Sequence, residues 1–340
     1  MKKYGAIVAG SVSLLVLLLS SALPRAESAS FYEGKTITIV VGYKPGGGYD
    51  NTARLLSRYL PKYIPGNPTV IVQNMPGANS LIAANHIYGV AKPDGLTIGT
   101  FNRNLPIAQF TAVEGVQFDM TKFAWIGSAA SETTIFAVRS DLPYNTFDDL
   151  RKSKKEIVVG ATGPGANTYD HPLFIKEFLG VNMKIVSGYS SSSDIMLAIE
   201  RKEADARSGS YSSIKPFIDR GLVRPLIRSR AVDPEIKALP VDEDLAPSKK
   251  ERAMFALRSA PEVIGRPYVA PPGTPADRLK ILQDAFEKAT QDKELLAEAK
   301  KAKMPIDFVS GEEAVKIVKD ILNQPAEFAQ EFSKYIKFGE

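Results

Sequence analysis

The chain has 340 residues, of which 44% are hydrophobic and 24% are charged, with a formal net charge of +5. This balance is that of a globular protein, and the length allows two domains that each bury a core. The chain contains no cysteine and no polybasic block, which excludes disulfides, thiol catalysis, cysteine metal sites and a lipid-modified cysteine, and leaves no electrostatic signature of nucleic-acid binding.

Residues 1–30 have the layout of a secretory signal peptide. Lys2 and Lys3 precede an uncharged apolar stretch at residues 6–19, and small residues follow around Pro24. A membrane anchor is the alternative, but this stretch is shorter than the ~20 apolar residues that cross a bilayer. We therefore expect a cleaved leader and, for a cysteine-free chain of this size, export to the bacterial periplasm.

From residue 36 onward, short apolar segments alternate with amphipathic ones. The first series has predicted strands at residues 36–41, 69–73 and 97–101, and predicted helices at residues 51–63 and 81–90. Repeated strand–helix–strand units predict parallel pairing with right-handed crossovers.

A second series of the same kind follows. It has predicted strands at residues 134–138, 157–160, 184–186, 204–208 and 223–227, and predicted helices at residues 146–152, 169–179, 195–201 and 214–220. A stretch rich in proline and acidic residues at 231–248 is typical of a surface connection. A short strand at 267–270 and three helical stretches complete the chain. The sequence therefore predicts two α/β units.

The first candidate site is the loop PGGGYD at residues 45–50, between a predicted buried strand and a helix. Its glycines, Gly46, Gly47 and Gly48, let the backbone approach a ligand without side-chain obstruction. Free N–H groups at the following helix start favour an anion, at the end of a strand where open α/β sheets bind ligands. Asp50 is placed to cap that helix, and this structural role is favoured over a role in binding.

The second candidate site is the loop GATGPGANT at residues 160–168, again between a strand and a helix. Thr162, Asn167 and Thr168 offer hydrogen-bond donors there, in addition to the backbone. One such loop is weak evidence, because strand-to-helix turns often need glycine. Two of them, in separate α/β units, predict opposed lobes that each present an anion cradle to a shared cleft.

Other polar residues follow the predicted strands and could line that cleft. They are Asn102, Arg103, Tyr189 and Arg207. Arginine is the natural bidentate partner of a carboxylate, and a surface ion pair is the alternative for each arginine.

Known catalytic and cofactor patterns are missing from the sequence. No lysine follows the first loop as a P-loop requires, the second loop lacks the third glycine of the dinucleotide fingerprint, and there is no G-x-S-x-G elbow. The two histidines, His86 and His171, have no second histidine at metal-ligand spacing. Acid–base catalysis by carboxylates stays open, but no pair stands out. We expect no cofactor and no metal.

The motifs in their order resemble the periplasmic solute receptors of tripartite tricarboxylate transporters, the Bug or TctC family. The resemblance rests on residues 37–50, NMPGAN at 74–79, PDG at 93–95, residues 160–168, GY at 188–189 and PPGTP at 271–275. Each motif is unspecific alone, but together they run in family order across almost the whole chain after the leader. Three departures are Asn79 in place of a usual glycine, an unexpectedly polar segment at 207–211, and Arg103, which the family pattern does not demand.

The resemblance implies a two-lobed α/β periplasmic binding protein of the type II, or flytrap, class. Residues 31–126 and 262–340 would form lobe 1 and residues 127–261 lobe 2, with crossings near Trp125 and Arg266 and the C-terminal helices on lobe 1. Residue by residue, the family's first loop is matched by Gly46, Gly47, Gly48 and Asp50, its second by Thr162, Gly165, Asn167 and Thr168, and a later loop by Tyr189.

The function implied is that of a solute receptor rather than an enzyme. It would bind a small organic carboxylate between its lobes and deliver it, as a monomer, to the permease subunits of a membrane transporter. Two alternatives remain at this point: an exported α/β hydrolase that uses Asp or Glu, and a ligand-sensing module for a signalling receptor.

Overall fold

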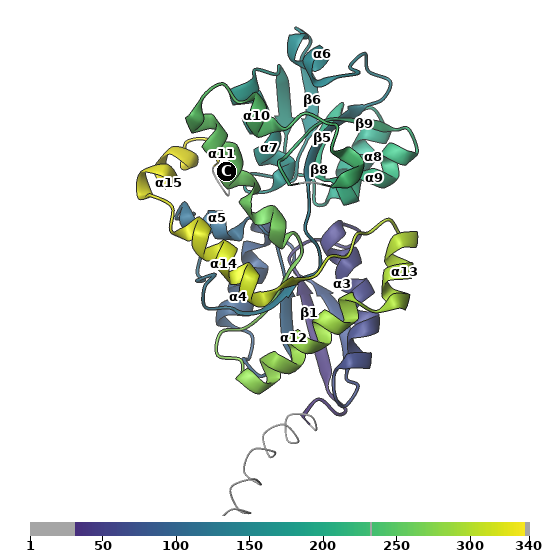
Figure 1. The fold of residues 1–340 in the computed structure, drawn as a ribbon, viewed down its shortest axis with the longest axis vertical. Helices are drawn as coiled ribbons and strands as arrows, with labels where there is room; N and C mark the ends of the chain where they lie inside the picture. Colours follow the sequence, from purple (N-terminus) through teal and green to yellow (C-terminus); the bar gives the residue numbers. More distant parts are fainter. Residues whose placement is uncertain (1–30, 232, 337–340) are drawn as a thin grey trace, which may run out of the picture.

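The computed structural model describes residues 31–231 and 233–336. The predicted leader at residues 1–30 lies outside the described residues. Within the described ranges, no helix is long and apolar enough to cross a bilayer. The described chain forms two α/β lobes, one above the other in Figure 1.

The first lobe is built on a six-stranded sheet with the order β11-β4-β10-β3-β1-β2. Its strands are β1 (Thr36–Val41), β2 (Thr69–Asn74), β3 (Thr97–Thr100), β4 (Ala124–Ser128), β10 (Pro267–Ala270) and β11 (Val309–Ser310). Strand β1 pairs in parallel with both β2 and β3, as predicted. Its side chains Ile37, Ile39, Val40 and Val41 are all buried, because helices cover both faces of the sheet.

Not all of this sheet is parallel. Strand β10 runs antiparallel to β3 and β4, and β11 runs antiparallel to β4. These strands enter the sheet after the chain returns from the other lobe, so no local crossover helix fixes their direction. The helices of this lobe are α3 (Gly48–Tyr59), α4 (Leu81–Gly89), α5 (Leu105–Phe110), α12 (Ala276–Thr290), α13 (Lys293–Lys301) and α14 (Gly311–Leu322).

The second lobe is built on a five-stranded sheet with the order β7-β6-β8-β5-β9. Its strands are β5 (Thr134–Arg139), β6 (Ile157–Gly160), β7 (Met183–Val186), β8 (Ala206–Ser210) and β9 (Val223–Arg228). Strand β6 pairs in parallel with β7 and β8, while β5, which enters from the first lobe, is antiparallel to β8 and β9. The helices are α6 (Phe147–Lys152), α7 (Asn167–Leu179), α8 (Ser192–Glu200), α9 (Tyr211–Asp219), α10 (Asp242–Leu245) and α11 (Lys249–Ser259).

Two crossings between the lobes, at residues 129–133 and 264–266, lie side by side, and a third connection follows α14 at residues 323–325. The Ala129 N–H donates to the Arg266 carbonyl at 3.0 Å, and the Glu132 N–H donates to the Glu262 carbonyl at 2.8 Å. The crossings leave the two sheets free to face each other across a cleft.

The last helix, α15 (Ala326–Ser333), packs on the second lobe. The Phe332 ring meets the Phe174 ring edge-on at 5.5 Å between centroids, and Tyr335 meets Phe178 at 4.8 Å. Helices α12 to α14 pack with the first lobe, whereas α15 lies against α7 and α11 of the second. Phe174 and Phe332 are buried there, and Phe178 and Tyr335 are half-buried.

Candidate functional site

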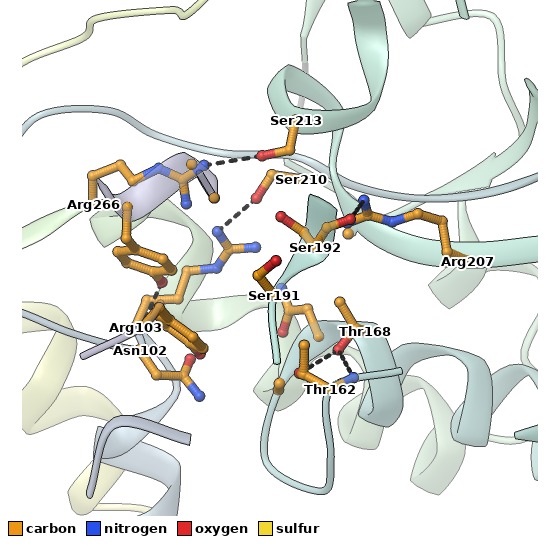
Figure 2. A pocket seen from close by; sticks show the side chains of 17 residues that line it. Asn102, Arg103, Thr162, Thr168, Ser191, Ser192, Arg207, Ser210, Ser213 and Arg266 are labelled. Atoms are coloured by element: carbon orange, nitrogen blue, oxygen red, sulfur yellow. Dashed lines mark hydrogen bonds between the residues drawn. The ribbon is translucent and has the colours of Figure 1, made fainter. Parts of the chain in front are cut away.

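A cavity lies between the two lobes, where four helices begin. It encloses about 600 Å³, part of it open to solvent. Figure 2 shows its polar lining, with Arg103, Arg207 and Arg266 approaching from different sides.

The cavity is lined by the N-terminal residues of helices from both lobes. Gly47 precedes α3 in the first lobe, while Ala166, Ser191 and Ser210 precede α7, α8 and α9 in the second. Among the described residues, the N-cap side chains of α3, α7 and α9 make no capping hydrogen bond. The first N–H group of α9, that of Tyr211, donates to the Thr133 carbonyl at 2.8 Å, whereas the first N–H groups of α3 and α7 have no partner among the described residues. Each helix start carries partial positive charge.

Helix α3 begins three residues earlier than predicted, inside the glycine loop. Gly48 is its first residue, and a Cβ there would meet the Arg266 Nη2 atom at 2.5 Å and the Ser213 Oγ atom at 2.9 Å. Because residue 48 has no side chain, the first turn of α3 can lie against both the Arg266 side chain and the facing second lobe. Only the predicted helix boundary changes, and the loop stays at the end of strand β1.

Asp50 supports the first loop from behind rather than capping α3. Its carboxylate accepts hydrogen bonds from the Gly46 N–H at 2.9 Å, the Arg54 side chain at 2.9 Å and the Asn74 amide at 2.8 Å. Burial opposes ionisation of Asp50, but these hydrogen bonds outweigh it and hold its pKa below the usual value. Asp50 therefore fixes the loop while Arg54 offsets its charge.

Asp170 supports the second loop in the same way. Its carboxyl group accepts a hydrogen bond from the Gly165 N–H at 2.8 Å. Burial raises the pKa of Asp170 to about 8, so the group is mostly uncharged at neutral pH. In front of it, the Thr168 hydroxyl accepts from the Thr162 N–H at 3.0 Å and bonds the Thr162 hydroxyl at 2.7 Å. Asp50 and Asp170 thus hold the two loops in place without adding an uncompensated negative charge beside the cavity.

Three buried arginines line the cavity, and their partners differ. Arg266 pairs with Glu132 at 2.7 Å. Arg103 donates to the Ser210 hydroxyl at 3.0 Å and the Thr134 hydroxyl at 3.2 Å, and its Nε has no partner among the described residues.

Arg207 is equally enclosed. It donates to the carbonyls of Ser192 and Ser208 at 3.0 and 3.1 Å. Burial lowers its pKa to about 10, which still leaves it charged at neutral pH. In the described parts of the chain, neither Arg103 nor Arg207 has an acidic side chain within ion-pair distance. Buried charge is stable when it is compensated, so these two side chains give the cavity an affinity for anions.

Direct contacts hold the two lobes together around the cavity. The Asn102 amide donates to the Gly165 carbonyl at 2.8 Å, and the Asn104 amide donates to the Asn167 amide oxygen at 2.7 Å. The Asn79 amide donates to the Pro164 carbonyl, so the residue that departs from the family pattern joins the first lobe to the second loop. The lobes are therefore closed on each other in this structure.

The family model described as the tripartite tricarboxylate transporter family receptor, TctC, matches residues 53–333. The chain belongs to this family. It is thus a solute receptor of the kind found in the periplasm, not an enzyme, and the predicted family is confirmed. A UPF0065 protein of Cupriavidus necator is 26% identical over 302 residues, which cover 83% of this chain and 82% of that protein.

Solved structures of periplasmic binding proteins share the fold of this TctC-family receptor. BugD superposes with a TM-score of 0.74 at 21% identity, covering 90% of this chain and 100% of BugD. MatC from Rhodopseudomonas palustris, with bound malate, gives 0.70 at 18% identity over 87% and 99% of the two chains. R. palustris Rpa4515, with adipate, gives 0.71 at 19% identity over 89% and 98%. The predicted two-lobed α/β fold class is confirmed.

Most of the residues that the sequence singled out line the cavity of the receptor. They are Gly47, Gly48, Asn102, Arg103, Thr162, Asn167, Thr168 and Arg207. Gly46, Asp50 and Gly165 lie behind the cradles, as described above. Tyr189 lines a neighbouring hollow together with Tyr43 and Asn79. As ligand contacts, all twelve residues stay predictions.

Sequence reasoning did not select several other residues of the cavity wall. They are Tyr43, Tyr49, Ala166, Ser191, Ser192, Gly209, Ser210, Ser213 and Arg266. Two signals could have found some of them: the aromatic residues that flank the first loop, whose rings stack at 5.1 Å, and the run of four serines at 190–193 that begins α8. Among the described residues, no group of acidic and histidine side chains is arranged to hold a metal ion.

Proposed function

We propose that this receptor binds a small organic carboxylate in the cavity between its lobes and delivers it to the permease subunits of a tripartite transporter. One observation supports this most strongly. The starts of α3 and α7 and two buried arginines, which have no acidic partner among the described residues, line a single cavity. Such a site is suited to an anion.

The carboxylate would lie between the starts of α3 and α7. Backbone N–H groups near Gly47, Gly48 and Asn167 would donate to its oxygens, with trapped waters completing the shell. Arg103 or Arg207 would hold a second carboxylate or a polar tail. The malate and adipate in the structures of MatC and Rpa4515 are acids of the proposed kind, which supports this reading.

Transport would follow from hinged closure. Residues 31–126 with 262–322 would move as one lobe and residues 127–261 with α15 as the other, about the paired crossings and the connection at residues 323–325. The hydrogen bonds from Asn102 and Asn104 across the cleft would form on closure and bury the ligand. The chain would reach the periplasm through a cleaved leader, act as a monomer, and present its closed form to the permease.

Binding of a carboxylate to the mature protein must raise its melting temperature. We expect a rise of about 4 °C at 100 times the dissociation constant, because binding then adds about 2.7 kcal/mol to the native state and unfolding a chain of this size has an entropy of about 0.65 kcal/mol per kelvin. A thermal-shift screen with acetate, benzoate, malate, adipate and citrate measures this. The matching amides, which lack the charge, are the controls. No shift with any acid would contradict the proposal, and chemical change of a bound acid would favour the hydrolase alternative.

A further inference from the structure

Arg266 belongs both to a crossing between the lobes and to the wall of the cavity. Its backbone N–H donates to the Ser128 hydroxyl at 3.0 Å, which fixes the second crossing against strand β4. Its guanidinium carbon lies 4.6 Å from the ring centroid of Tyr49 on α3, and its Nη2 atom lies 3.5 Å from the Ser213 hydroxyl on α9. The side chain therefore contacts both lobes at the edge of the cavity (Figure 2).

Glu132, on the other crossing, stands behind this arginine. Its Oε1 atom is 2.7 Å from Arg266 Nη2, and both its carboxylate oxygens accept from the Ser212 hydroxyl, at 2.9 and 2.8 Å. The side chain occupies the space beside Gly265, where an added Cβ would meet it at 2.5 Å. Glu132 lines the neighbouring groove together with Arg266 but is not part of the cavity lining. The acid thus holds Arg266 from the neighbouring groove, outside the cavity lining.

This arrangement differs from that of the other two arginines. Arg103 and Arg207 face the cavity with hydroxyl and carbonyl partners, whereas the charge of Arg266 is offset by a carboxylate that is nearly as buried as itself. The attraction between a bound anion and Arg266 is therefore reduced, because Glu132 repels the same anion from a slightly longer distance.

We propose that Glu132 sets the affinity of the receptor by partly cancelling the attraction of Arg266 for the bound acid. This inference rests on the proposed function. The pair joins the two crossings and contacts α3 and α9. The residues that set the affinity for the ligand therefore lie at the hinge. A weaker hold on the acid favours its release when the lobes open, which a transport receptor needs.

A series of charge variants tests this in the mature protein. The probe is whichever of malate, adipate, citrate, benzoate or acetate raises the melting temperature most, and calorimetric titration gives its dissociation constant. We expect Glu132→Gln to bind about tenfold more tightly than the wild type and Arg266→Gln to bind at least about tenfold more weakly. The double variant leaves no charge at the pair and should bind within about threefold of the wild type.

Tighter binding by Glu132→Gln is the decisive result, because a purely structural pair predicts weaker binding when either member is lost and restoration when both are lost. The double variant buries no unpaired charge, so its affinity relative to Arg266→Gln still tests the proposal where Glu132→Gln folds poorly. Asp292→Asn is the matched control: this buried acid pairs with Lys62 at 2.7 Å in the first lobe, and its loss should lower the melting temperature without tightening binding.

Two outcomes would overturn the inference, and they are distinguishable. Wild-type protein that binds none of the five acids removes the proposed function and this inference with it. Wild-type protein that binds, with a folded Glu132→Gln variant no tighter than the wild type or a double variant no tighter than Arg266→Gln, removes only the role of Glu132.

Discussion

Replacing Arg103 by glutamine should weaken binding of the carboxylate by about 100-fold. Arg103 is 3% exposed and lines the cavity. In the complex it would face the ligand with little water between them, and removing one member of a buried charged pair costs about 2–5 kcal/mol, where 1.4 kcal/mol is tenfold. In the ligand-free protein the same change removes a buried charge that has no acidic partner among the described residues. The melting temperature of the free protein should therefore stay the same or rise.

Calorimetric titration and thermal unfolding of Arg103→Gln separate these two effects. The control is Arg220→Gln, because Arg220 is an exposed residue whose partner is Glu200 at 3.0 Å on the outer surface of the second lobe. It should bind as the wild type does. If Arg103→Gln binds with the wild-type affinity, Arg103 does not contact the ligand and the acid lies elsewhere in the cavity.

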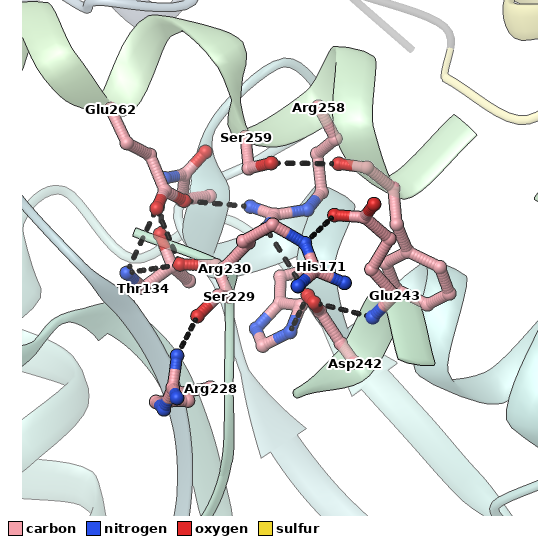
Figure 3. A network of polar contacts seen from close by, with 12 residues as sticks. Thr134, His171, Arg228, Ser229, Arg230, Asp242, Glu243, Arg258, Ser259 and Glu262 are labelled. Atoms are coloured by element: carbon pink, nitrogen blue, oxygen red, sulfur yellow. Dashed lines mark hydrogen bonds and ion pairs between the residues drawn. The ribbon is translucent and has the colours of Figure 1, made fainter. Parts of the chain in front are cut away.

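Replacing Arg258 by methionine should destabilise the protein by about 3–5 kcal/mol. Arg258 is fully buried in the second lobe and pairs with Asp242 at 3.3 Å and Glu262 at 3.2 Å (Figure 3). Without it, two buried carboxylates lose their only guanidinium among the described residues, and breaking a buried pair in this way has that cost. In the wild type, burial and the charge of Arg258 lower the pKa of His171, which lies 3.1 Å from Asp242 in the same network.

Unfolding in urea measures this loss as a lower midpoint with an unchanged slope. The matched control is Arg230→Met, since Arg230 also joins two acids, Glu243 and Asp244, but is about half exposed. An exposed pair contributes less than about 1 kcal/mol, so this control should unfold near the wild-type midpoint. Equal midpoints for the two variants would show that the buried network is not what stabilises the lobe.

The Arg258 network also positions the cavity wall, so replacing Arg258 should disturb that wall as well. Glu262 accepts a hydrogen bond from the Thr134 N–H at 3.3 Å, while the Thr134 hydroxyl accepts from Asn167 at 2.7 Å on the cavity side. At the other end, His171 bonds the Ser208 hydroxyl at 2.9 Å, next to Arg207. Both lining strands of the second lobe thus depend on one buried set of charges.

The cradles could be predicted from the sequence because their cause is local. Glycines between a buried strand and an amphipathic helix place a helix start at the end of a sheet, and this happens independently at Gly47 and near Gly165. That both starts open into one cavity follows from two lobes facing each other. Five of the predicted residues line it for this reason, namely Gly47, Gly48, Thr162, Asn167 and Thr168.

The rest of the site depends on contacts between distant segments. Arg266 lines the cavity because the second crossing lies beside the first, which no local pattern encodes. Asp242 lies in a stretch whose proline and acid content indicated a surface connection, yet it is buried because Arg258 and His171 meet it. The antiparallel strands and the docking of α15 likewise follow from the chain's returns between the lobes.

A crystal structure of the mature protein with its best-binding acid tests the central claim most directly. The account predicts a carboxylate between the two lobes, with its oxygens within hydrogen-bond distance of backbone N–H groups at the starts of both α3 and α7. An acid bound on an outer surface, or held by only one lobe while the other helix start faces solvent, would contradict it.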